Sequence, residues 1–196
     1  MADCVLKILD GLDPTCQAKR RQGGVNKRIF IGNFDDITTT DDADGYIDTV
    51  VLTSSPAAFL YEFIGQDFKH NYAYEGTIGE NINTINPTLN LVLYYFTPAE
   101  RSAIEQLYNA EKLVAFVEGN GGEGKATIEI FGLTNGLKAS ALSGGSGTNL
   151  NDTTALTISL AGEEDSLAKV LKTGSFNPNQ SGYLQENIEY LEALVA

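Results

Sequence analysis

The residues that could carry out chemistry in this chain are few and stand apart from one another. The single histidine, His70, lies in a polar stretch with no cysteine nearby. The GxSxG, HExxH and GxxxxGK[ST] motifs are absent, and no GxGxxG follows an expected strand. A lone histidine in a polar stretch is usually a surface or strand-edge residue. We therefore expect no catalytic base and no enzyme activity.

The acidic run Asp41–Gly45 has the composition of a calcium-binding loop. An EF-hand needs an aspartate at its first position and a glutamate six residues after the glycine. Thr40 and Val51 occupy those two positions, so the sequence does not predict an EF-hand. A casual surface cation is the only metal that this run leaves open.

Two further patterns resemble sites but lack the groups that would complete them. Gly144–Gly147 has the composition of a phosphate cradle without the lysine and the following helix that attract an anion. The carboxylates of Asp35, Asp36 and Glu163–Asp165 could form a glycosidase pair, but the chain has no tryptophan to line a sugar cleft. We expect a flexible loop and solvated acidic positions instead.

The cysteines also do not form a recognisable site. Cys4 and Cys16 are the only two, and neither belongs to a CxxC pair. We expect free thiols, although a disulfide is sterically allowed, and we expect neither a metal nor a cofactor.

Charge is distributed unevenly along the chain. The 196 residues carry a formal net charge of −13, yet the first 28 hold six basic and three acidic residues. Residues 29–196 hold seven basic and 23 acidic residues, so this acidic body has the same sign of charge as DNA and should repel it instead of binding by counterion release. A basic arm on such a body favours contact between copies or docking on another acidic surface. The arm residues expected to make inter-subunit contacts are Lys19, Arg20, Arg21, Lys27 and Arg28.

Alternating apolar residues predict a chain made mostly of strands. The expected strands are Asn26–Phe34, Tyr46–Ser54, Thr88–Phe96, Leu113–Val117, Lys125–Phe131, Leu137–Leu142 and the alternating stretch around Ile158. Between them we expect a polar loop at Asp35–Gly45, a helix or strand at Ala57–Gln66 and an extended arm at Asp67–Glu80. Asn86 and Pro87 are the expected turn between that arm and the strand after it.

The segment Thr97–Lys112 is the one confidently expected helix. Thr97, Pro98 and Glu100 have the spacing of a capping box with proline at the first helical position. Ile104, Leu107 and Tyr108 share one helical face, which predicts a narrow core-facing stripe. After a short helix or loop at Glu163–Lys172 and a linker, Tyr183–Val195 is amphipathic and should dock on the body or on a neighbouring copy.

The order of these features resembles the tail tube proteins of tailed bacteriophages, in the version found in phages and prophages of Bacteroidetes. The resemblance rests on four stretches and covers roughly residues 1–165: GGVNKRIFIGNFDDI, TLNLVLYYF, TPAERSAIEQLYNAEKLVAFVEGNGG and IFGLTNGLKASALSGGSGTNLNDTTALTISLAGEE. It implies a mainly β fold, a β-sandwich or small barrel flanked by one α-helix, with arms at both ends. On this basis residues 1–24 are an N-terminal arm, 25–165 the tail-tube-like domain, and 166–196 a linker with an amphipathic tail.

The function that the resemblance implies is structural. Six copies would form a ring, and stacked rings would make the virion tail tube through which double-stranded DNA passes without specific binding. The expected partners are further copies of the chain and other tail proteins, in a virion made in the host bacterial cytoplasm, without membrane insertion. The polar arm then places Asp67, Glu75 and Glu80 toward the lumen.

Two alternatives remain open at this point. Residues after 165 fall outside the resemblance, so the chain could instead form a ring at the tail end or at a connector. A different class of protein, a β-sandwich adhesin or glycan binder, would need an exposed aromatic platform. Tyr72, Tyr74, Tyr94 and Tyr95 are the residues that could supply it.

Overall fold

The structure is a computed structural model, and it describes residues 25–53, 57–65, 69–79, 83–94, 97–119, 127–145, 154–172 and 183–195. These residues form a mainly β fold, as the sequence predicted, and they include two α-helices where the predicted fold had one flanking helix and a C-terminal amphipathic tail. In chain order the elements are β1 (Val25–Asn33), a 3-10 turn (Phe34–Asp36), β2 (Ile37–Asp41), β3 (Ile47–Leu52), β4 (Tyr61–Ile64), β5 (Asn71–Ile78), β6 (Asn83–Leu93), α1 (Pro98–Asn109), β7 (Leu113–Gly119), β8 (Ile128–Phe131), β9 (Lys138–Gly145), β10 (Ala155–Ala161), β11 (Lys169–Val170) and α2 (Tyr183–Glu192). No helix among the described residues is long and apolar enough to cross a membrane.

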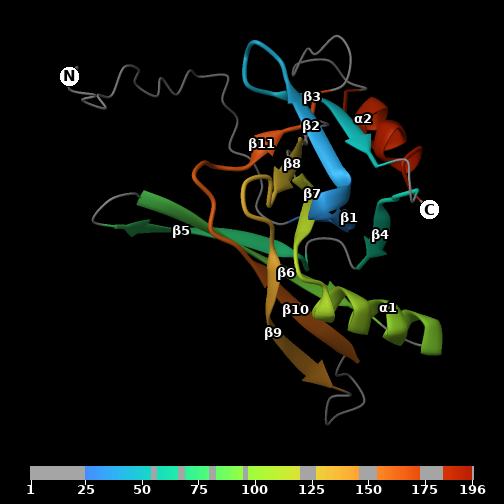
Figure 1. Ribbon diagram of the computed structural model, residues 1–196. Helices are drawn as coiled ribbons and strands as arrows, with labels where there is room; N and C mark the ends of the chain where they lie inside the picture. Colours follow the sequence, from blue (N-terminus) through green and yellow to red (C-terminus); the bar gives the residue numbers. More distant parts are fainter. Residues whose placement is uncertain are drawn as a thin grey trace, which may run out of the picture.

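The described strands form three antiparallel sheets (Figure 1). One has five strands in the order β11-β8-β7-β1-β4, one has four in the order β5-β6-β10-β9, and β2 pairs with β3 alone. A first core lies between the five-stranded and the four-stranded sheet. Ile29 and Val117 enter it from one sheet, and Leu91 and Ile158 from the other. These two sheets therefore pack as a sandwich.

The five-stranded sheet is buried on both faces at its centre. Along β1, Ile29 and Ile31 point into the first core, while Phe30 points into a second core on the opposite face. Along β7, Phe116 points into the second core in the same way. Because successive side chains alternate between faces, near-continuous apolar runs are what such central strands require.

The second core is closed by the β2–β3 pair and by the C-terminal helix. The Tyr190 hydroxyl of α2 donates to the Val50 carbonyl at 2.8 Å and accepts from the Val50 amide at 2.9 Å. Leu191 is fully buried there, and the Leu60 amide donates to the Leu194 carbonyl at 2.9 Å. Of the two docking modes expected for this amphipathic segment, the structure has the one on the body of the same chain.

The segment before this helix also joins the body. The sequence predicted a short helix or loop at Glu163–Lys172, but Lys169 and Val170 form β11 and extend the five-stranded sheet by pairing with β8. The Lys172 amide then donates to the Ile47 carbonyl at 2.7 Å. Long-range pairing thus decides the structure of a stretch whose local pattern is weak.

Helix α1 begins as its sequence predicts. The Thr97 hydroxyl accepts from the Glu100 amide at 3.3 Å, and the Glu100 carboxylate accepts from the Thr97 amide at 2.7 Å. Both bonds satisfy amides that the first turn of a helix leaves without partners. Ile104 and Leu107 are buried as expected, but Tyr108 is 42% exposed, so its place in the core stripe was wrong. The helix lies beside one end of the four-stranded sheet (Figure 1), and Ile104 and Leu107 are its buried residues.

Two local predictions failed because strand pairing overrode turn chemistry. The expected loop at Asp35–Gly45 contains β2, which pairs with β3 from Ile37 opposite Leu52. Asn86 and Pro87 are not a turn but lie inside β6, opposite Glu75 and Tyr74. The Pro87 carbonyl accepts from the Gly162 amide at 3.2 Å. Because β10 ends at Ala161, the N–H that proline lacks interrupts no hydrogen bond between β6 and β10.

The stretch before β5 contains a strand and a buried histidine. Tyr61–Ile64 is a strand, β4, and not a helix. His70 was expected at the surface or at a strand edge, yet it is only 1% exposed. Its Nδ1 accepts from the Val92 amide at 3.0 Å, so the ring lies between the start of β5 and the end of β6.

Candidate functional site: the polar sheet face and its open edges

The four-stranded sheet has one apolar face and one polar face. On β6 the residues Leu89 and Leu91 are buried in the first core, while Thr88 and Asn90 point the opposite way. On β10 the same alternation places Ile158 in the core. We call the side opposite the core the polar face.

Hydrogen bonds between side chains run across this face from strand to strand. The Asn90 amide group donates to Asn71 Oδ1 at 2.9 Å, and Ser159 Oγ donates to Asn90 Oδ1 at 2.6 Å. Farther along the hairpin, the Asn86 amide group donates to Thr77 Oγ1 at 2.8 Å. Cross-strand pairs of this kind hold side chains in one arrangement. The polar face is therefore an ordered surface of uncharged donors and acceptors.

The polar face is also nearly free of charge. The register places a charged side chain at only two of its described positions, Glu75 on β5 and Lys138 on β9. The other described positions carry amide, hydroxyl, or small apolar groups: Asn71, Ala73, Thr77, Thr84, Asn86, Thr88, Asn90, Val92, Ala141, Ser143, Ala155, Thr157, Ser159 and Ala161. The strong negative charge of the chain therefore lies elsewhere on the molecule.

The edges of the four-stranded sheet are long and unpaired by any strand of the described chain. β5 and β9 each have eight residues and stand at opposite ends of the strand order. The edges of the five-stranded sheet are much shorter, with four residues in β4 and two in β11. Neither β5 nor β9 contains the proline that often blocks an edge, so each offers a row of backbone groups to another strand.

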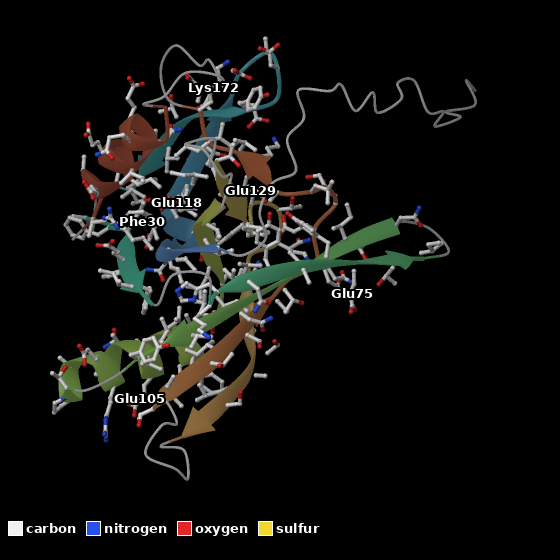
Figure 2. All side chains as sticks on the ribbon, turned by 180° about the vertical axis from the view of Figure 1, so that it is seen from behind. Phe30, Glu75, Glu105, Glu118, Glu129 and Lys172 are labelled. Atoms are coloured by element: carbon white, nitrogen blue, oxygen red, sulfur yellow. The ribbon has the colours of Figure 1, made fainter. Side chains whose placement is uncertain are left out.

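The end of the β5–β6 hairpin lies beyond the core (Figure 1). From Glu75 to Ile78 every residue of β5 is exposed, on both faces of the strand. Figure 2 shows Glu75 on this projecting part, well away from the α1 residue Glu105. On the β6 side, Ile85 exchanges two backbone hydrogen bonds of 2.8 Å with Glu164, and the last described pairs toward the tip, Thr77–Thr84 and Ile78–Asn83, are held by the two strands of the hairpin.

The expected lumen residues fall partly in this region. Glu75 is exposed on the polar face, whereas Asp67 and Glu80 lie outside the described residues, so their place toward a lumen stays a prediction. Of the three carboxylates expected toward the lumen, Glu75 is the one that the described residues include.

The expected inter-subunit arm is corrected at one position. Arg28 lies in β1 and forms ion pairs with Glu62 of β4 and, at 2.6 Å, with Glu192 of α2. The Glu62 hydrogen bond raises the pKa of the Arg28 guanidinium above its ordinary value. Arg28 thus contacts its own chain, because β1 is a central strand and not part of an arm. Lys19, Arg20, Arg21 and the side chain of Lys27 lie outside the described residues.

In the aspartate run that resembled a calcium loop, the Asp42 carboxylate accepts hydrogen bonds from groups of its own chain. Asp42 Oδ1 accepts from the amides of Asp44 and Tyr46 at 2.9 and 3.0 Å, and Lys172 Nζ lies 2.6 Å from Asp42 Oδ2. The hydrogen bond from Lys172 lowers the pKa of the Asp42 carboxyl below its ordinary value. Within the described residues, no group of three histidines, cysteines or acidic residues could hold a metal ion.

The aromatic residues considered for a glycan platform mostly point into the protein. Tyr72 and Tyr74 lie on the core side of β5, with ring centroids 5.0 and 5.9 Å from that of Phe131. Burial raises the pKa of Tyr74 to about 12. Tyr94 lines a groove beside α1, and Tyr95 lies outside the described residues. These side chains do not form one exposed platform.

No family model matches this chain. No curated protein matches it either.

Sequence reasoning missed the polar network because the network depends on register. Thr88 and Asn90 in TLNLVL, and Thr157 and Ser159 in LTISLA, do show the period of a two-sided strand. What the sequence does not show is that Asn90 lies opposite both Asn71 and Ser159. The alternating Asn, Thr and Ser residues were the available signal.

Glu164 holds the loop between β8 and β9 through its side-chain carboxylate. Its carboxylate is buried and accepts from the amides of Thr134 and Asn135 at 2.8 and 3.2 Å. Glu164→Ala removes both acceptors, so we expect the free energy of unfolding to fall by about 2 kcal/mol in urea titrations. The control is Asp165→Ala, which removes only an exposed bond from the Thr134 hydroxyl and should cost less than about 1 kcal/mol. Equal losses in the two variants would contradict this role for Glu164.

Proposed function

We propose that this chain is a structural protein of a phage tail, which assembles with copies of itself into stacked rings that form a tube for DNA. The observation that carries the proposal is the four-stranded sheet with two long open edges and a polar, nearly uncharged outer face. The resemblance of the sequence to tail tube proteins supports it independently.

The two open edges fit each other in direction. Neighbouring strands in the order β5-β6-β10-β9 are all antiparallel, so β5 and β9 run in opposite directions. Pairing β5 of one copy with β9 of the next continues the antiparallel pattern without a break. Such a head-to-tail contact uses a different surface on each partner, and it closes into a ring when the rotation per copy divides the circle.

A closed ring of this kind would surround an open passage. Six copies would give a barrel of about 24 strands, and at about 4.8 Å spacing and about 40° tilt its backbone diameter is about 48 Å. Barrels of about 16 strands already leave an aqueous channel. The core face of each sheet is covered by its own chain, so the polar face would line the passage.

The chemistry of the polar face suits a duplex that must move. Only Lys138 offers a cation to phosphate at the described positions, so little counterion release would favour binding. Three of the Asn and Ser side chains, those of Asn86, Asn90 and Ser159, already donate to other side chains of this face, and these bonds compete with contacts to phosphate oxygens. The overall charge of −13 has the same sign as that of DNA and therefore adds electrostatic repulsion.

The proposal is tested by the assembly state of the purified full chain. We expect rings or tubes in negative-stain electron micrographs and a sedimentation coefficient far above that of a 21.1 kDa monomer. Single rings that never lengthen, even with the full set of tail proteins, would favour the tail-end or connector alternative. A chain that stays monomeric at high concentration and in the virion would contradict both.

A matched pair of variants tests whether the open edge of β9 makes the ring. Leu142 is 43% exposed on the core side of this edge, and Leu142→Lys places an inward-pointing charge on the edge strand. We expect this variant to remain folded and to form no rings. Leu167→Lys is the control, because Leu167 is 60% exposed and lies outside all strands. Rings formed equally well by both variants would exclude β9 from the interface.

A further inference from the structure

One large apolar side chain stands almost entirely in solvent at the end of the hairpin. Ile78, the last residue of β5, is 89% exposed. It belongs to the row of β5 that includes Tyr72 and Tyr74, whose rings pack on the first core. The core-facing row therefore continues past the end of the core, and its final residue has nothing of its own chain to pack against among the described residues.

An apolar groove lies at the far end of the same sheet. It has a volume of about 610 Å³ and runs between strand β4 and helix α1. Tyr61, Ile64, Leu93, Ala103, Ile104 and Leu107 contribute to its lining. Tyr61 and Ile64 are 49% and 58% exposed, so this groove presents apolar surface to solvent. Its volume is that of about 20 liquid water molecules, which is room for more than one side chain.

The length of β6 keeps these two features apart within one chain. Asn83, at the start of β6, pairs with Ile78, while Leu93, at its other end, lines the groove. The eleven residues of β6 span ten steps of about 3.3 Å, which places the two features about 33 Å apart. Ile78 therefore cannot reach the groove of its own chain.

We propose that the groove between β4 and α1 receives the hairpin end of another copy, with Ile78 as its apolar anchor. Both features occur once in every copy, at opposite ends of one sheet. A contact between unlike surfaces of identical molecules propagates in one direction and is heterologous. Exposed apolar surface at both features supplies the driving force for the contact.

The contact deepens the proposed function, on which it rests. Pairing of β5 with β9 would act across the strands and close rings, whereas the hairpin contact acts along the strands. Two contacts in these different directions are what a stack of rings requires. The hairpin contact would therefore join one ring to the next.

The first test replaces the anchor. Ile78→Asp should leave the monomer folded, because the side chain is exposed, and should leave rings intact while abolishing tubes. Loss of one buried isoleucine weakens a contact by about tenfold to a hundredfold, and the copies of one ring multiply this loss. The control is Ile78→Leu, which keeps the apolar volume and should still form tubes in negative-stain micrographs.

The second test uses complementation between two defective proteins. Ile64→Asp alters the groove and keeps the anchor, whereas Ile78→Asp alters the anchor and keeps the groove. Each protein alone should give single rings. A mixture should give pairs of rings and nothing longer, since only one of the two possible contacts retains both partners.

The outcomes separate this inference from the proposed function. Tubes of ordinary length from Ile78→Asp protein would overturn the hairpin contact and leave ring formation standing. Failure of the mixed proteins to pair would also overturn it, provided that both keep the circular dichroism spectrum and thermal transition of the parent chain. A parent chain that forms no ring at all would overturn the proposed function and the hairpin contact together.

Discussion

His70→Ala should lower the free energy of unfolding by about 3 kcal/mol, a large part of the total for a domain of ordinary stability. The ring is fully enclosed, and its Nδ1 accepts from the Val92 amide at 3.0 Å. Alanine leaves both a cavity and a buried amide without its acceptor. Urea unfolding followed by circular dichroism measures the loss. Because the His70 imidazole fixes the start of β5, the same variant should also reduce assembly of the chain into oligomeric rings.

Two other variants check this role of His70. Lys69 is exposed and adjacent in sequence, so Lys69→Ala should change the free energy of unfolding by less than about 0.5 kcal/mol. Gly65 lies against the imidazole so closely that a Cβ there would be 2.2 Å from His70 Nε2. Gly65→Ala should therefore be destabilising alone and less so in the His70→Ala background, because the clash with the ring is then relieved while the 2.6 Å approach to the Val92 carbonyl remains. A His70→Ala protein as stable as the parent would refute the assignment.

In the proposed tail tube, replacing Asp67, Glu75 and Glu80 together by lysine should slow DNA release at least about tenfold at low salt without stopping assembly. Lysines that face the passage would bind phosphates and release counterions, and the effect should shrink steeply as salt is raised. The kinetics of DNA ejection from virions carrying the variant, followed over a salt series, measure it. Glu75→Lys alone should give a smaller change in the same direction, since Glu75 lies on the polar face.

The control for this experiment carries the same change of charge on other surfaces. Asp48, Glu105 and Glu111 are exposed on β3, on α1 and just after α1, and none belongs to the four-stranded sheet. Their replacement by lysine should leave DNA release unchanged. A release rate that is normal in both triple variants at every salt concentration would remove the three residues from the lumen, whatever the assembly state.

Local sequence signals predicted those parts of the fold that are stabilised locally. The Thr97–Glu100 capping box starts α1 because both of its bonds join residues three apart. The alternation in Asn26–Phe34 and around Ile158 predicted β1 and β10, because successive side chains of any strand point to opposite faces of its sheet. The same alternation, repeated along the chain, predicted a mainly β fold, which the structure confirms.

The errors arose where distant segments decide the outcome. Asn86 and Pro87 have the composition of a turn, yet they pair with β5 because the hairpin register continues past them. His70 looks polar in sequence, yet the ring is buried because β6 passes beside it with an amide that needs an acceptor. Tyr108 shares the helical face of Leu107 but lies past the line along which α1 meets the sheet.

By itself, the sequence determined that this chain is mainly β with one well-capped helix. Periodicity and capping act within a few residues, so a single sequence displays them. Only the tertiary structure decided that Asn71, Asn90 and Ser159 form one row, that β5 and β9 are open edges, and that Ile78 stands far from an apolar groove. These features depend on which strands become neighbours, and that choice is made by burial of the two cores across long sequence separations.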